Sequence, residues 1–363
     1  MKTKKHLITL LILTVALPAS AQTEVLTGIM RGKDYGVTYM LPKTELQFTA
    51  TVTHHTYTRG EYADYAKRYL HLDDGSFKAT DSWTLDSIKV EVAGVPDKER
   101  TYFVKLKDRT VAPLMQLTAD GIVQSINVPT AQQRRPQAVL PPPAEPAATP
   151  APVDPNRYMT EEMLLATSNA RRAELVAKEI FNIRESRNNL LRGEAETMPQ
   201  DGEQLKLMLD NLNRQEAALT ELFVGRSHSQ TTTRTWRVEP KVVKQKVLFR
   251  FSEKVGVLES DVPESGNPES YPVLLTLIDL KDIVLPESDG KKQTEGVAYN
   301  VPGRGRLVLT CNGSELLRTE VPVTQFGVVE YLAPVLFNKN STIQVTFNPV
   351  TGGLLKVDRE TTK

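Results

Sequence analysis

The sequence predicts a mainly β protein with α-helices (α+β): two β-rich modules, the C-terminal one β-sandwich-like, with a helical hairpin between them. Three patterns favour this fold class. Apolar and polar residues alternate from Glu45 to Tyr57, as in a half-buried strand. Between Met163 and Ile180 apolar residues recur every three or four positions, as on one face of a helix. From Thr233 to Phe347, short apolar segments alternate with turn residues, as in a β-sandwich.

The length of 363 residues corresponds to about two domains. We expect a signal peptide at 1–21, an N-terminal β-rich domain with one short helix at 22–128, a Pro-rich linker at 129–157, a helical hairpin at 158–225 and a C-terminal β-sandwich-like domain at 226–363. The sequence does not show whether the two β modules share one core, and it does not show the oligomeric state.

The first 21 residues have the pattern of a secretory signal peptide. Three lysines precede an apolar run from Leu7 to Leu17, and small residues then lead up to Ala21. We expect cleavage between Ala21 and Gln22. The alternative is a retained anchor, but the run is shorter than the roughly 20 residues of a transmembrane helix. This pattern predicts an exported protein, periplasmic or associated with an outer membrane, without a transmembrane segment in the mature chain.

The N-terminal region reads mainly as strands. Beyond 45–57, we expect strands at 87–92, 101–107, 115–118 and 122–128, with a hairpin turn at 119–121. Residues Glu61 to Leu72 fit one short helix, because Tyr62, Tyr65, Ala66 and Tyr69 follow helical spacing. Core packing is the expected role of that aromatic stripe.

The linker has nine prolines among the 27 residues from Pro129 to Pro155. Proline removes backbone donors and fixes φ, so we expect an extended segment without sheet or sustained helix.

The helical hairpin has clear start and stop signals. Thr160 and Asp201 are expected N-caps, Asp201 together with Gln204, and Gly225 is expected to end the second helix. We expect the apolar stripe to pack on the domain's own sheet. The charged outer face is expected to be solvated, and Arg184 and Arg187 are its candidate docking residues.

The C-terminal region returns to strands. The expected ones cover residues 233–238, 242–251, 273–278, 296–300, 307–311, 316–323, 328–330, 342–347 and 354–357.

Motifs that carry chemistry are missing from the sequence, so we expect no catalytic, cofactor-binding or metal-binding residues and lean against an enzyme. His54 and His55 are adjacent on a strand and must point to opposite faces. The single cysteine, Cys311, shares a strand face with Leu307 and Leu309, which predicts a buried thiol. With 45 basic and 44 acidic residues, the chain lacks the net charge of a nucleic-acid-binding protein.

Several segments together resemble the exported Bacteroidota proteins of the domain of unknown function 4831 family. These segments are Tyr39–Thr44, Tyr62–Leu70, Ile180–Arg187, Leu191–Glu194, Gly296–Gly303 and Phe347–Gly353. The resemblance implies a cell-envelope protein and supplies no activity, catalytic residue or cofactor. It also implies that Asp86-Ser87-Ile88 is an O-glycosylation signal of that phylum, with Ser87 as the acceptor; the alternative is an unmodified strand start.

We therefore expect a non-catalytic structural or interaction component of an envelope assembly, whose partners are other envelope proteins. The alternative is a carbohydrate-binding or glycan-processing protein. Paired carboxylates in a cleft flanked by exposed aromatic residues would favour this alternative.

Overall fold

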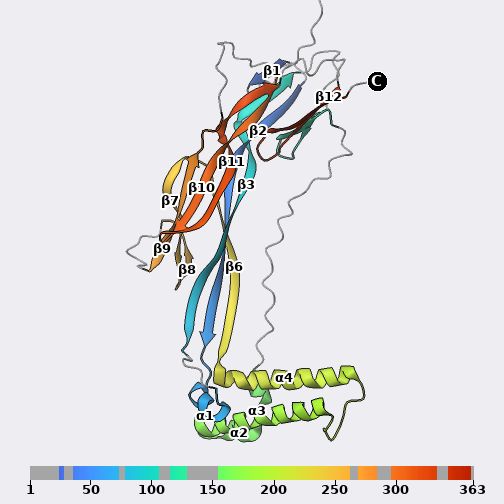
Figure 1. Ribbon diagram of the computed structural model, residues 1–363, viewed down its shortest axis with the longest axis vertical. Coiled ribbons are helices and arrows are strands. Elements are labelled where there is room, and N and C mark those ends of the chain that lie inside the picture. Colours follow the sequence, from blue (N-terminus) through green and yellow to red (C-terminus); the bar gives the residue numbers. More distant parts are fainter. Residues whose placement is uncertain are drawn as a thin grey trace, which may run out of the picture.

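The computed structural model describes residues 24–27, 36–72, 78–105, 115–128, 154–261, 269–283, 296–332 and 342–360. The expected signal peptide, its cleavage site at Ala21 and Gln22, and linker residues 129–153 lie outside this described part. Within it, strands dominate and a helical hairpin is present, which confirms the predicted fold class (Figure 1).

The strands form three antiparallel sheets. The first has the order β1 (Glu24–Thr27), β3 (Thr80–Lys105), β2 (Gly36–Thr58), β6 (Arg226–Val238). The second has the order β11 (Ser314–Leu332), β10 (Val297–Cys311), β9 (Ser270–Asp279), β7 (Val243–Ser252), β8 (Gly256–Leu258). The third has the order β13 (Leu354–Glu360), β12 (Thr342–Phe347), β5 (Val123–Ile126), β4 (Met115–Leu117).

The two β-rich regions share both their sheets and their cores. Strand β6 pairs with β2, and β12 pairs with β5, although each pair joins residues far apart in the chain. The sandwich forms between the first sheet and the second, so one of its layers comes mainly from the N-terminal region. The alternation in β2 explains this packing: Leu46, Phe48, Ala50 and Val52 are buried against the second sheet, as the sequence predicts for that face.

A second β core lies further along the same strands. Tyr39 and Tyr102 of the first sheet pack there with Ala298 of the second and with Val345 and Phe347 of the third. Six expected strands are joined in pairs into longer ones in the structure: 87–92 and 101–107 in β3, which ends at Lys105, 296–300 and 307–311 in β10, which begins at Val297, and 316–323 and 328–330 in β11. These strands are long because they pass through both cores.

The two cores are joined by the buried side chain of Asn300. Its Nδ2 donates to the carbonyl oxygens of Pro42 (2.8 Å) and Thr351 (2.9 Å), and Arg100 donates to its Oδ1 (3.3 Å). A second tie lies nearby, where Thr44 and Thr324 exchange backbone-to-hydroxyl hydrogen bonds of 2.9 and 3.0 Å. Buried polar groups of this kind are stable only when paired, so each tie fixes one relative position of the strands.

The helices form a third core, away from both β cores. They are η1 (Ala63–Tyr65), α1 (Ala66–Leu70), η3 (Pro155–Tyr158), α2 (Glu161–Leu165), α3 (Asn169–Arg192) and α4 (Gly202–Val224). The predicted N-caps Thr160 and Asp201 and the predicted end at Gly225 are confirmed. A break at Ala166–Ser168, with Ser168 as a new N-cap, separates α2 from α3.

The apolar stripe of the hairpin does not pack on a sheet, which corrects the expectation from the sequence. Ala173, Ala177 and Ile180 of α3 pack instead on Phe223 of α4 and on Tyr62. Helix-on-helix packing is favoured because small alanines let the helices approach closely.

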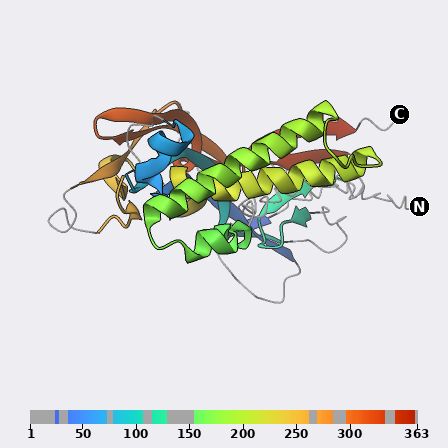
Figure 2. The same cartoon turned by 90° about the horizontal axis from the view of Figure 1, so that it is seen from below.

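A stalk connects the helices to the sandwich. It consists of residues 53–58 of β2, 80–84 of β3 and 226–231 of β6, and α3 and α4 lie across its far end (Figure 1). At about 3.4 Å per residue, the 13 residues of β6 span roughly 44 Å. Viewed from below, α3 and α4 run side by side and project to one side of the stalk (Figure 2).

The Asn300 tie gives a first prediction. Asn300→Leu leaves the carbonyls of Pro42 and Thr351 buried without a donor, so we expect a loss of about 2–4 kcal/mol in the free energy of unfolding. Urea titration followed by tryptophan fluorescence measures it. The matched control is Asn182→Leu, an exposed position where we expect a change within about 0.5 kcal/mol. Equal stability of the two variants would contradict the role given to Asn300.

Candidate functional site

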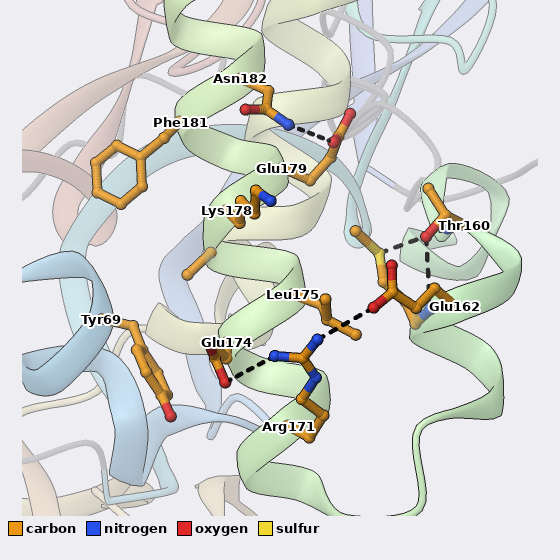
Figure 3. Close-up of a pocket in the computed structure, with 12 residues that line it drawn as sticks. Tyr69, Thr160, Glu162, Arg171, Glu174, Leu175, Lys178, Glu179, Phe181 and Asn182 are labelled. Atoms are coloured by element: carbon orange, nitrogen blue, oxygen red, sulfur yellow. Dashed lines mark hydrogen bonds and ion pairs between the residues drawn. The ribbon is translucent and has the colours of Figure 1, made fainter.

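Chemically diverse side chains outside the β cores line a groove along α3 (Figure 3). This groove of about 550 Å³ is formed by α3, α2 and Tyr69 of α1. Its floor contains the buried side chains of Met163, Leu175 and Ala177. Its position follows from the break at 166–168, which lets α2 fold back beside α3.

Several polar groups of the groove are paired with one another. Arg171 lies between Glu162 and Glu174, with N···O distances of 3.1 and 3.2 Å (Figure 3). These carboxylates raise the pKa of the Arg171 guanidinium. Glu179 accepts a hydrogen bond from Asn182 (3.1 Å). Paired, exposed charges around an apolar floor fit contact with a polypeptide better than the activation of a nucleophile.

The candidate docking residues Arg184 and Arg187 face α4. Arg184 Nε lies 2.6 Å from Glu216 Oε1, and Arg187 donates to Glu216 Oε2. Glu216 is only 16% exposed, so this carboxylate holds two arginines at the α3–α4 interface. Their part in docking stays a prediction. Replacing both arginines with Glu would place three carboxylates together with Glu216, and their repulsion would disturb the α3–α4 interface.

A second pocket, of about 560 Å³, lies where the stalk leaves the sandwich. It is lined by aromatic residues, among them Trp83, Phe251 and Tyr271, and by one carboxylate, Glu253. The Trp83 ring is stacked on His54 at 4.2 Å between centroids, and Gly256 lies against the Trp83 ring as well. Glycosidases use two carboxylates, and the described lining of this pocket supplies one. Among the described residues, the pocket thus has a single carboxylate and not the pair expected for the glycan-processing alternative.

The histidines follow the predicted alternation. His54 contacts Asp81 (2.7 Å), while His55 contacts Ser229 and Thr84 on the opposite face. In the described part of the chain, no group of three or more His, Cys, Asp or Glu side chains could hold a metal ion. No described helix is long and apolar enough to cross a membrane.

Ser87 is exposed on β3, opposite Thr51 of β2. A shift in the β2–β3 register leaves its neighbour Asp86 without a partner residue on β2. The Asp86 carboxylate accepts instead from the hydroxyls of Thr53 (2.5 Å) and Thr84 (2.9 Å). The Ser87 hydroxyl is thus accessible; its modification stays a prediction.

Cys311 lies at the end of β10 and lines the second pocket. It is partly buried against the sandwich core, where its neighbours Leu307 and Leu309 are fully buried. Burial raises the pKa of the Cys311 thiol, which lowers its thiolate fraction and its reactivity.

This thiol gives a second prediction. Because Cys311 is the single cysteine, alkylation reports on one site. At pH 8 we expect iodoacetamide to react with the folded protein at least about tenfold more slowly than with the urea-unfolded chain, as followed by mass spectrometry. A folded-state rate equal to or above that of the unfolded chain would indicate an activated cysteine.

The segments that the sequence analysis singled out are spread over the whole structure. Tyr39–Thr44, Gly296–Gly303 and Phe347–Gly353 meet at the Asn300 tie, and Tyr62–Leu70 and Ile180–Arg187 build the helical core. The family model described as Domain of unknown function (DUF4831) matches residues 35–355, nearly the whole chain. No curated protein and no solved structure matches this chain. The chain therefore belongs to the DUF4831 family.

Proposed function

We propose that the protein is an exported, non-catalytic interaction component of a cell-envelope assembly of a Bacteroidota bacterium, periplasmic or associated with the outer membrane. Its helical hairpin is the element that contacts other envelope proteins. The observation that carries this proposal is the position of the hairpin: it has a core of its own and lies at the end of the stalk, away from both β cores.

Several large apolar side chains are exposed on the helical hairpin. Leu165 is 71% exposed, Leu191 62% and Leu207 58%, and Phe181 at the edge of the α3 groove is exposed as well. Single exposed apolar residues are common, but these all lie on one projecting element. Large apolar anchors surrounded by charged residues are typical of protein–protein contact surfaces.

The joint between stalk and hairpin supports presentation in a fixed direction. Tyr57 of β2 donates to the carbonyl of Val224 (2.6 Å), and Arg226 of β6 pairs with Glu221 of α4 (2.6 Å). Gly225 has φ +77°, and a Cβ at this position would overlap the carbonyl oxygen of Thr58. A joint this tightly packed limits hinge motion between the two parts.

The proposal can be tested with a triple variant in the native host. Leu165→Gln, Leu191→Gln and Leu207→Gln together remove exposed apolar anchors and keep good helix formers. After cross-linking and affinity purification, we expect recovery of the partner proteins to fall about tenfold.

The matched control is the pair Val242→Gln and Leu355→Gln, which are 57% and 61% exposed on the β part of the molecule. Circular dichroism should find both variants folded, because exposed substitutions change stability little. Full recovery of partners by the triple variant, or glycan hydrolysis by the purified protein, would overturn the proposal.

Export and modification are tested together by intact mass. We expect the protein from native envelopes to lack residues 1–21 and to begin at Gln22. We also expect an added glycan mass that disappears in Ser87→Ala. A chain that keeps Met1, or an identical added mass in Ser87→Ala, would contradict the corresponding part of the proposal.

A further inference from the structure

Among the described residues, strand β6 has one edge without a partner strand along its whole length. It is the last strand of its sheet and pairs only with β2. The pairing runs without a register shift from Leu46↔Val238 to Thr58↔Arg226. On the other side, no described strand accompanies it, so every second residue directs its backbone N–H and C=O groups outward.

The other sheet edges of the described chain are short, tied down or contain residues that block an edge. Strand β3 is an edge from Thr80 to Thr101, beyond its pairing with β1, but it contains Lys89, Pro96 and Lys98, and the edge strand β13 contains Lys356. Strands β1, β4 and β8 have three or four residues each. The long edge strand β11 is fastened to β2, where Gln325 donates to the carbonyl of Thr44 (2.8 Å) in addition to the Thr44–Thr324 pair. By contrast, β6 contains no proline, lysine or bulge, the usual devices that block an edge.

The side chains of β6 give this edge a positive charge. The strand has three arginines and no acidic residue. Two of them have partners: Arg226 pairs with Glu221 (2.6 Å), and Arg237 lies 3.7 Å from Glu45. Arg234, near the middle of the strand, is exposed and has no ion-pair partner among the described residues.

The shape of the molecule limits what can add to this edge. The sheet with β12 at one end and the α3–α4 hairpin at the other both project on the side of β6 (Figures 1 and 2). The free edge therefore lines the concave side. An antiparallel second copy would have to place its own sandwich where the hairpin lies, so a narrow extended segment fits better.

We propose that the free edge of β6 binds an extended, acidic segment of another polypeptide, which adds to the sheet as a further strand. Main-chain hydrogen bonds to β6 hold the segment, and a carboxylate beside Arg234 selects it. The hydroxyl-rich face of β6, where Thr231 and Thr235 already bond to Thr53 and Thr49 of β2, would continue into the added strand. This surface is separate from the hairpin surface of the proposed function.

The test uses two synthetic nine-residue peptides, one alternating Thr with Asp and one alternating Thr with Lys, and the full mature chain. We expect the Asp peptide to bind in fluorescence anisotropy and to slow amide hydrogen exchange within 226–238. Arg234→Glu should weaken binding of the Asp peptide about tenfold and favour the Lys peptide. Lys89→Glu, the same charge change on an exposed residue of β3, should leave binding unchanged.

The backbone is tested with Thr232→Pro and Thr233→Pro. Adjacent amides of a strand point alternately to its two neighbours, so one of these prolines faces the free edge and keeps the pairing with β2. That folded variant should lose the Asp peptide, whereas the hairpin triple variant should bind it normally.

Three outcomes would overturn the proposal. They are unchanged amide exchange in 226–238, equal effects of Arg234→Glu and Lys89→Glu, or a concentration-dependent dimer that the folded proline variant abolishes. The last would assign the edge to self-pairing. None of these outcomes tests the proposal that the hairpin contacts envelope proteins. That proposal would be contradicted only by the partner-recovery experiment.

Discussion

The carboxamide of Asn300 holds together three chain segments that the sequence keeps far apart. It bonds β10 to the Pro42 carbonyl of β2 and to the Thr351 carbonyl before β13, and Arg100 of β3 completes its partners. The β2–β3 register shifts between Met40 and Pro42, and the β10–β11 register between Val301 and Gly303, so both ladders are irregular at this level. Each ladder shifts once more further along, between Thr51 and Val52 and between Leu309 and Thr310, but at the Asn300 level the irregularity coincides with buried polar groups that are paired, so the long strands can pass through both β cores.

The positions of the stalk and the hairpin depend on the strands that meet at Asn300. Strands β2 and β3, which contact Asn300 at one end, continue through the sandwich and form the stalk together with β6. The stalk ends at Thr58 of β2 and Arg226 of β6, where the helical part joins it. Tyr57, Gly225 and the Arg226–Glu221 pair then fix the hairpin against the stalk. The direction of the hairpin is therefore set by strand twist and by a few local contacts, and not by packing on the sandwich.

Local patterns in the sequence predicted the elements, and the sequence could not identify their partners. The N-caps Thr160 and Asp201 depend on bonds three residues away, to Met163 and Gln204, so they can be recognised without the fold. The buried face of β2 was predictable from alternation alone. The pairing of β2 with β6 was not, because both strands present a similar run of threonines to any neighbour. The same limit applies to Arg184 and Arg187: their spacing on α3 gives a face, but only the fold brings Glu216 to it.

The groups with perturbed pKa values are spread over the described structure and do not share one cleft. Burial raises the pKa of Tyr39 in the second β core and raises that of Tyr102 to about 12. Arg304 of β10 lowers the pKa of Asp282, which follows β9. These shifts arise in separate places from packing and from surface ion pairs, whereas active sites concentrate them in one cleft. The two surfaces proposed above to bind partners, the apolar hairpin and the basic edge of β6, lie on the same concave side. Because the joint fixes their separation, a partner that touches both would bind the second surface as an intramolecular event, which raises affinity without any further contact.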